Sequence, residues 1–410
     1  MRCRFGRCWG VGRRFKEVLT VTGASQWGCG SGFLTGEPAL PRIAALFHEP
    51  SRMSQVAAAP IPWTDPARQQ AFNAWLQSRP AGLGLRPDTL RSASADASFR
   101  RYFRIDAAQG SLIIMDAPPS HEDCRPFVAV ARLLASGEVG VPRILDWDEA
   151  QGFMLLSDLG AHTLLSTLDV AQPHDAGNRA RYNAALDELV RLQAVPANDL
   201  PPCDDALLQR ELDLFPDWYF TQLRGQVLDD KAREVLSRSF ALIKAQVLAQ
   251  PVVLVHRDYH SRNLMADPAD AQARPGVIDF QDAVRGPVTY DLVSLLRDAY
   301  VMWDEDVQLD YAVRYWEKAR KAGLPVPEDF GDFWRDFEWM GLQRHIKVLG
   351  IFARLAIRDG KQQYLADIPR VWTYAHRVAS RYQGLGPLAR LLEQAEADHG
   401  GLRTEVGFTF

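Results

Sequence analysis

The residues best suited to chemistry lie in two short segments of the second half of the chain. Asp258 belongs to a His-Arg-Asp triplet that follows an apolar run at 252–255, and Asn263 comes five residues after it. Asp279 follows a second apolar run, Val277-Ile278. This order and spacing match the catalytic loop and the metal-binding strand end of enzymes that transfer a phosphoryl group to an alcohol. The sequence therefore predicts phosphoryl transfer.

Phosphoryl transfer asks the protein to position reactants and to neutralise charge, which assigns a role to each residue. We expect Asp258 to accept a hydrogen bond from the attacking hydroxyl, and Asn263 and Asp279 to hold Mg²⁺, which prefers oxygen ligands. An isolated His-x-Asp is more often a turn or a helix cap, but here two segments occur in the right order. Arg257 and His260 are equally compatible with contacting the substrate and with supporting the loop.

The segments around these motifs resemble the aminoglycoside phosphotransferase family, the small-molecule branch of the kinase fold. The resemblance rests on 256–263, on Asp279-Phe280-Gln281-Asp282-Ala283 and on 286–292, where protein kinases would carry Asp-Phe-Gly and later Ala-Pro-Glu. It implies that Asp291 supports the catalytic loop. Segments 98–104, 115–119 and 343–350 are most similar to bacterial anomeric kinases of N-acetylmuramate and N-acetylglucosamine, and the likeness covers about residues 60–395.

The resemblance implies a fold, a reaction and cofactors. The fold would be α+β and two-lobed, with a small β-rich nucleotide-binding lobe at 61–157 and a larger, mainly helical lobe at 158–400 for catalysis and substrate binding. The protein would use ATP and Mg²⁺ to phosphorylate the C1 hydroxyl of either sugar in peptidoglycan recycling. Two alternatives stay open: a kinase of an aminoglycoside or choline-like alcohol, and an inactive kinase-fold module that only binds.

The expected nucleotide site departs from the kinase pattern. A polar segment, 94–98, would lie over the phosphates through Ser94, Ala97 and Ser98, although an ordinary polar turn explains it too. The strand that should carry a Lys reads Leu-Ile-Ile-Met at 112–115. Arg101 and Arg104 on the preceding strand could replace that charge, and because they face opposite sides we favour one of them, Arg101. By resemblance, Leu156 and Asp158 belong to a hinge at the adenine.

A predicted helix at 340–358 carries four basic residues on one face: Arg344, Lys347, Arg354 and Arg358. Such a stripe is often only a solvated surface. If it faces the cleft, Arg344 and Lys347 could attract the lactyl carboxylate of N-acetylmuramate. A polycationic acceptor would require clustered acids instead, and the run Asp304-Glu305-Asp306 keeps that alternative open.

Composition narrows the class of protein. The 410 residues exceed the usual size of one domain, and a net charge of −4 with a pI near 6.2 argues against nucleic acid as the main partner. No apolar run is long enough to cross a bilayer. Five cysteines without zinc or disulfide spacing fit a reducing cytoplasm, and we expect a monomer. Residues 1–52 show no periodicity, so we expect them to be disordered, or an artefact preceding a true start at Met53.

Overall fold

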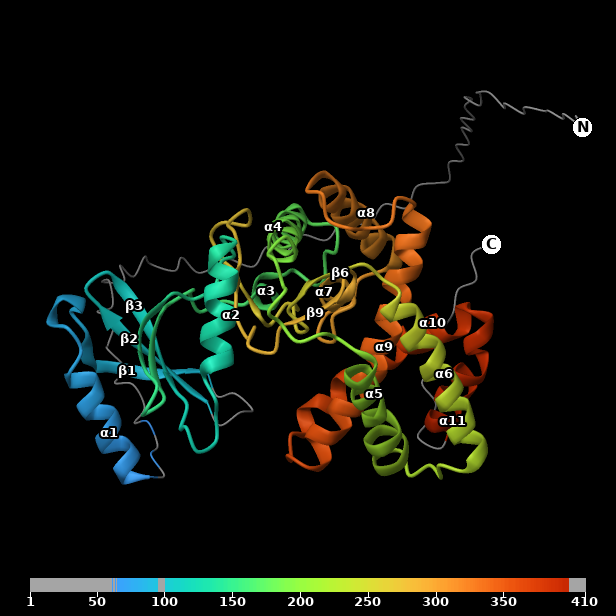
Figure 1. Cartoon of the computed structure of the whole chain (residues 1–410), viewed down its shortest axis with the longest axis horizontal. Helices are drawn as coiled ribbons and strands as arrows, with labels where there is room; N and C mark the ends of the chain where they lie inside the picture. Colours follow the sequence, from blue (N-terminus) through green and yellow to red (C-terminus); the bar gives the residue numbers. More distant parts are fainter. Residues whose placement is uncertain (1–60, 62, 64, 95–99, 398–410) are drawn as a thin grey trace, which may run out of the picture. The chain divides into compact units, whose positions relative to one another are not determined.

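A five-stranded antiparallel sheet forms the first part of the described chain, in the order β1-β2-β3-β5-β4 (Figure 1). Its strands are β1 (Arg86–Ser94), β2 (Arg101–Ala107), β3 (Gly110–Asp116), β4 (Ile144–Asp148) and β5 (Phe153–Ser157). The structure is a computed structural model that describes residues 61, 63, 65–94 and 100–397. All of these residues belong to one compact unit.

Two helices pack on opposite faces of this sheet. Helix α1 (Pro66–Gln77) is capped by Asp65, whose carboxylate accepts the N–H of Ala67, and its Phe72 packs edge-on to Phe103 of β2 with ring centroids 5.4 Å apart. Helix α2 (Arg125–Ser136) belongs to the other hydrophobic core, where its Phe127 meets Phe280. Because side chains alternate along a strand, the residues of β2 divide between these two faces.

The second part of the chain is mainly helical. Its elements are α3 (Leu164–Thr167), α4 (Ala176–Gln193), α5 (Asp205–Leu214), the π-helical η2 (Phe215–Leu223), α6 (Asp230–Leu248), β6 (Val252–Val255), β7 (Leu264–Met265), β8 (Gly276–Val277), β9 (Val284–Pro287), α7 (Tyr290–Leu296), α8 (Glu305–Lys321), α9 (Phe330–Ile357), η3 (Gln362–Asp367), α10 (Ile368–Arg381) and α11 (Gly386–Ala397). Strand β6 pairs with β9, and β7 with β8. Helix α9 is largely buried and packs against α10, η2, α5 and α7.

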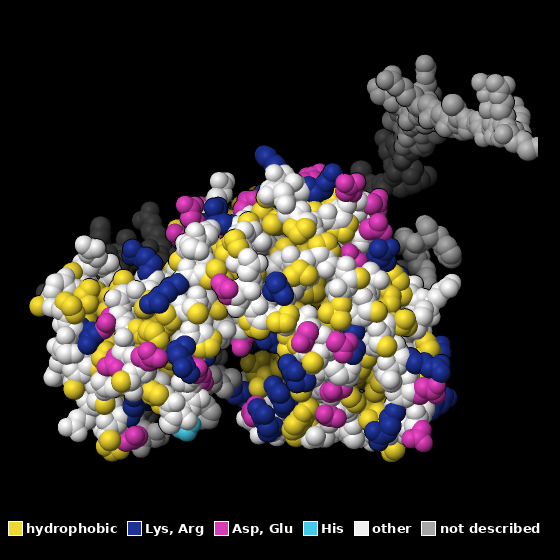
Figure 2. All heavy atoms as spheres, viewed as in Figure 1, with side chains coloured by type: hydrophobic (Ala, Val, Ile, Leu, Met, Phe, Trp, Pro, Cys, Tyr) yellow, Lys and Arg dark blue, Asp and Glu magenta, His cyan; other side chains and the backbone are white. Residues whose placement is uncertain are grey.

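The expected α+β class, a β-rich part followed by a mainly helical part, is confirmed. Strand β1 was missed, because its Pro, Asp and Ser residues favour turns while its pairing with β2 is a tertiary effect. The extension at 1–52 lies outside the described residues. Among the helices that are described, none combines the length and the apolarity that a membrane span requires. Figure 2 shows side chains of both charges interspersed over the visible face.

Candidate active site

The loop between β6 and β7 is held in shape by a buried carboxylate. Asp291, at the start of α7, accepts the backbone N–H groups of His256 at 2.7 Å and of Arg257 at 3.0 Å. Burial raises the pKa of Asp291 to about 6. The Nδ1 of His256 accepts the N–H of Asp258, which leaves Nε2 to donate to the carbonyl of Ile278 at 3.0 Å. The imidazole thus joins the loop to the segment that carries Asp279.

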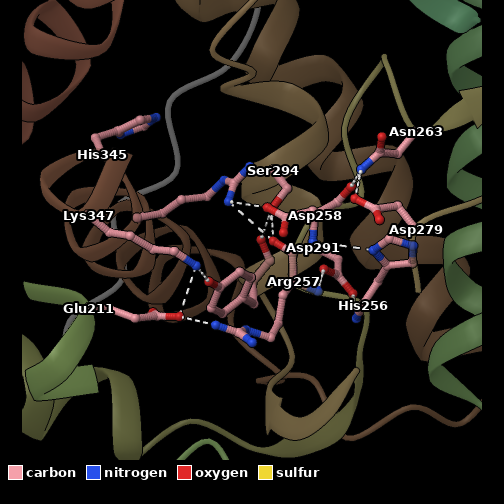
Figure 3. Close-up of polar contacts among 12 residues, drawn as sticks. Glu211, His256, Arg257, Asp258, Asn263, Asp279, Asp291, Ser294, His345 and Lys347 are labelled. Atoms are coloured by element: carbon pink, nitrogen blue, oxygen red, sulfur yellow. Dashed lines mark hydrogen bonds and ion pairs between the residues drawn. The ribbon is translucent and has the colours of Figure 1, made fainter. Parts of the chain in front are cut away.

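Asp258, Asn263 and Asp279 all line one cavity of about 790 Å³. The Nδ2 of Asn263 donates to the backbone carbonyl of Asp258 at 3.0 Å and lies 3.4 Å from Oδ2 of Asp279 (Figure 3). Asp279 adopts a positive φ of 66°, which is uncommon for a residue other than glycine. The three side chains that the sequence singled out therefore converge, although they come from two segments.

Asn263 and Asp279 are residue types that can bind a magnesium ion through oxygen. In this structure the amide of Asn263 directs Nδ2 towards the loop carbonyl and Oδ2 of Asp279 (Figure 3), so Oδ1 would bind the ion after rotation of the amide. Mg²⁺ is commonly held by one or two protein oxygens together with substrate phosphates, rather than by a complete protein cage. Among the described residues, no cluster of three or more His, Cys, Asp or Glu side chains is placed to hold a metal ion.

Arg104 lies on the cavity side of the sheet. Its guanidinium bonds both oxygens of Asp158, at 2.5 and 2.9 Å, and the carbonyl of Gly160 at 2.7 Å, and Ser111 also donates to Asp158. Leu156 and Asp158 line the cavity as well. The cation that faces the cavity from β2 is therefore Arg104.

Arg101, which the sequence favoured, is placed on the α1 face of β2, outside the cavity lining. It shares the buried carboxylate of Asp116 with Arg68, and its guanidinium lies over the ring of Trp63. Strand alternation places residues 101 and 103 on this face, and 102 and 104 on the other. Three residues were expected to cover the phosphates. Of these, Ser94 is the last residue of β1, and Ala97 and Ser98 lie outside the described residues.

Arg344 reaches the catalytic loop from α9. Its side chain is 4% exposed; Nη1 donates to the carbonyl of Arg257 at 3.2 Å and lies 3.5 Å from Oδ1 of Asp258. Desolvation by itself raises the pKa of Asp258, but the positive charges of Lys347 and Arg344 outweigh it and lower the pKa. Asp258 therefore stays ionised across the neutral range, which makes it a good hydrogen-bond acceptor and a weak base.

A buried ion cluster lies behind the loop and outside the cavity lining. Glu211 of α5 accepts from Arg257 at 2.5 Å, from Lys347 at 2.8 Å and from Gln343 at 3.0 Å, while Lys347 also donates to Tyr290 (Figure 3). Arg257 and Lys347, expected at the substrate, thus point to Glu211. Glu211 was missed, although its position beside Leu208 and Leu212 on the apolar face of α5 was a signal.

The other end of the cavity is aromatic. It is lined by His260, Arg262, Tyr300, Phe352 and Tyr364, of which the sequence indicated only His260. Burial lowers the pKa of His260, so its imidazole is neutral at neutral pH. The expected basic stripe is not one surface, because Arg344 and Lys347 are buried and Arg358 is exposed, where it pairs with Asp359.

Comparison with known proteins shows which family the sequence belongs to. The model of the phosphotransferase enzyme family matches residues 89–330. A protein of Pseudomonas aeruginosa named N-acetylmuramate/N-acetylglucosamine kinase is 48% identical over 80% of this chain and 97% of its own length. A protein of the same name from Neisseria meningitidis serogroup B is 45% identical over 84% of this chain and 99% of its own.

Solved structures agree at the level of the fold. Aminoglycoside 2'-phosphotransferase-IIIa in its GDP complex has a TM-score of 0.51 at 15% identity, over 80% of this chain and 99% of that one. The gentamicin complex of APH(2")-IIa has the same TM-score at 14% identity, over 76% and 97%. Since the family model spans more than half of the sequence and the two bacterial relatives share almost half of their aligned residues with it, this chain belongs to the phosphotransferase enzyme family.

Proposed function

We propose that this protein is an ATP-dependent kinase that phosphorylates the C1 hydroxyl of N-acetylmuramate and N-acetylglucosamine. The observation that carries the proposal is the convergence of Asp258, Asn263 and Asp279 on one cavity, in a chain whose relatives at 45–48% identity are named kinases of these two sugars. Cell-wall recycling is the context in which such a kinase would act.

In the proposed reaction, the C1 oxygen attacks the terminal phosphorus of ATP, ADP leaves, and the hydroxyl proton passes to Asp258. Oδ1 of Asn263 and the carboxylate of Asp279 would hold Mg²⁺, which when bound neutralises phosphate charge. A carboxylate with a lowered pKa takes a proton only late, which suits an acceptor more acidic than an ordinary alcohol. The hemiacetal hydroxyl at C1 is such an acceptor, because the ring oxygen withdraws electrons from it.

The remaining predicted residues receive narrower roles in this proposal. Leu156 and Asp158 would contact the nucleotide at the hinge, with Arg104 as the cation of the sheet, while Ser94, Ala97 and Ser98 would cover its phosphates. Arg344 and His260 would contact the acceptor from the cavity wall. Arg257 and Lys347 would act through Glu211, by keeping the loop and its charge in place.

The charges of the cavity disfavour the cationic acceptor. The acidic side chains that line it are Asp158, which is paired with Arg104, and the two proposed catalytic carboxylates. The acidic run at 304–306 lies outside the lining, and its Glu305 pairs with Arg381. An aminoglycoside or choline-like alcohol would therefore find little unpaired negative charge. The inactive module is disfavoured because Asp258, Asn263 and Asp279 are all present and line one cavity, although the strand Lys of the kinase pattern is missing.

The test is incubation of the full chain with magnesium ATP and each sugar, followed by analysis of the product. We expect a sugar phosphate whose reducing end no longer reacts, and ADP formed in equal amount. Asp258→Asn should lose turnover by at least about a hundredfold while still binding ADP. Asp217→Asn, at an exposed carboxylate on η2, is the matched control and should keep full turnover. Phosphorylation at a position other than C1, or near-normal turnover of Asp258→Asn, would refute the proposal.

A further inference from the structure

Arg262 differs from the other arginines that line the cavity. Arg104 is paired with Asp158, and Arg344 lies against Asp258. Arg262 is exposed, and its guanidinium carbon lies 3.6 Å from the centroid of the Tyr300 ring. This cation–π contact is its only interaction with the described residues, so no carboxylate in that part of the chain neutralises it. The cavity thus presents one cation that is positioned but not paired.

A buried carboxylate, that of Asp298, positions the loop segments that carry Arg262 and Tyr300. Asp298 is fully buried, and its Oδ2 accepts from the backbone N–H of Ser261 at 2.9 Å and from the Ser261 hydroxyl at 2.5 Å. Its Oδ1 accepts the backbone N–H of Tyr300 at 2.9 Å. One side chain therefore fixes the residue next to Arg262 and the ring below it. The guanidinium and the ring are held in register by the loop backbone, and not only by their own attraction.

The ring continues into an aromatic wall. Tyr300 lies 6.2 Å from Phe352, and Phe352 lies 5.1 Å from Tyr364, with ring centroids as the reference points. His260 stands edge-on to Tyr300, and its buried Nδ1 has no hydrogen-bond partner within the described residues. Aromatic faces of this kind pack against apolar surface, including the C–H face of a sugar ring, and an unpaired imidazole nitrogen suits a sugar hydroxyl.

We propose that Arg262, held over Tyr300, binds the lactyl carboxylate of N-acetylmuramate and sets the preference for this acidic sugar over N-acetylglucosamine. The inference rests on the proposed function, and it deepens that function by assigning the residue that distinguishes the two sugars. Arginine is suited to the task because its planar fork matches a carboxylate in two parallel hydrogen bonds. Arg344, which the sequence suggested for this role, is buried against Asp258 and the carbonyl of Arg257.

The test compares both sugars with the full-length wild type and Arg262→Gln at saturating magnesium ATP. We expect kcat/KM for N-acetylmuramate to fall by at least about tenfold, mainly through KM, and kcat/KM for N-acetylglucosamine to change by less than about twofold. The methyl ester of N-acetylmuramate removes the charge from the sugar side. If the contact is direct, kcat/KM for the ester should be nearly the same for the wild type and Arg262→Gln. The two proteins and the two ligands together form a double-mutant cycle.

Tyr300 supplies the matched controls. Tyr300→Phe keeps the ring under the guanidinium and should keep the preference, whereas Tyr300→Leu should weaken it in the same direction as Arg262→Gln. Equal losses for both sugars, or a rise in KM for ATP with the sugar KM unchanged, would overturn the inference in favour of a phosphate contact.

A binding measurement separates this inference from the proposed function. Calorimetric titration of each sugar into the wild type and Arg262→Gln, with ADP and magnesium present, reports affinity without turnover. A wild type that binds both sugars but phosphorylates neither would refute the proposed function, while selective loss of N-acetylmuramate affinity in the variant would still support the role of Arg262. Equal affinities in the two proteins, or no binding of either sugar to the wild type, would overturn that role.

Discussion

Oδ1 of Asp258 and Nη1 of Arg344 lie 3.5 Å apart, although 86 residues separate them in the sequence. The same guanidinium donates to the carbonyl of Arg257, so it contacts both the side chain of the proposed base and the backbone just before it. Because Arg344 is buried, its charge is little screened by solvent. Arg344 therefore contacts the loop that positions Asp258 and, together with Lys347, lowers the pKa of that carboxyl.

Arg344→Gln should shift the acid limb of the pH profile to higher pH. In the proposed mechanism Asp258 has to be ionised to accept the hydroxyl proton, and the positive charges of Lys347 and Arg344 lower its pKa. Removing one of these charges raises that pKa, so activity should begin to fall at a higher pH on acidification. The measurement is kcat/KM for N-acetylglucosamine from about pH 8 down to about pH 3, a range that extends below the ordinary pKa of an Asp side chain. Arg354→Gln, on the same helix but outside the cavity lining, is the control and should leave the pH profile unchanged. If the acid limbs of the wild type and Arg344→Gln coincide, Arg344 does not lower the pKa of Asp258.

Glu211→Gln should lower the free energy of unfolding by about 3–5 kcal/mol, because it leaves Arg257 and Lys347 buried without their shared counter-ion. Urea denaturation followed by circular dichroism measures this loss. Asp205→Asn on the same helix removes an exposed partner of Lys244 and should cost less than about 1 kcal/mol. A Glu211→Gln protein as stable as Asp205→Asn would show that the cluster contributes little.

The same cluster predicts a pH dependence of stability. Burial by itself raises the pKa of Glu211, but Lys347 and Arg257 outweigh it and lower the pKa from 4.5 to about 2. A carboxyl whose pKa is lower in the folded than in the unfolded state stabilises the fold above the unfolded pKa, and this contribution disappears as the pH falls from about 4.5 towards 2. Unfolding free energies measured across this window should fall more steeply for the wild type than for Glu211→Gln. Parallel curves would contradict the lowered pKa.

Arg104→Gln should raise KM for ATP by about tenfold, because it removes the charged contacts that join β2 to Asp158 and Gly160 at the proposed hinge. KM for the sugar should change little, since the acceptor end of the cavity lies elsewhere. Arg86→Gln, at an exposed arginine of β1 that pairs with Asp106, is the control and should leave both constants unchanged. A larger effect on the sugar KM than on the ATP KM would argue against a nucleotide role.

Gly350→Ala should destabilise the protein by about 1–3 kcal/mol, because a Cβ at this position would overlap the backbone carbonyl of Leu214 at the end of α5. The effect opposes helix propensity, which favours Ala over Gly. Gly341→Ala on the same helix is the control: its Cβ would come no closer than 3.4 Å to Arg297, so it should be neutral or slightly stabilising. The midpoint of thermal unfolding distinguishes the two variants, and equal midpoints would refute the close contact.

The sequence by itself determined the reaction class and the α+β architecture. The Asp258, Asn263 and Asp279 set could be identified because its spacing within two segments is local, and apolar runs mark the strands that carry it. The start of helix α1 is also marked locally, by Asp65 as the N-cap and Pro66 as the first helical residue. Such features depend on neighbours along the chain, which a sequence displays directly.

The tertiary structure alone decided which charges meet. The sequence alone does not show which of Arg101 and Arg104 faces the cavity. The packing of α1 on one face of the sheet leaves the other face, which carries Arg104, to line it. Glu211 pairs with Arg257 and Lys347, which lie at least 46 residues away in the sequence, so neither side chain points to the substrate cavity. Asp298 binds the backbone of Ser261 and Tyr300, and Arg262 lies over the Tyr300 ring. These contacts depend on how helices and loops distant in sequence pack together, because a buried charge such as that of Lys347 requires a partner of opposite charge, whereas the exposed Arg262 does not.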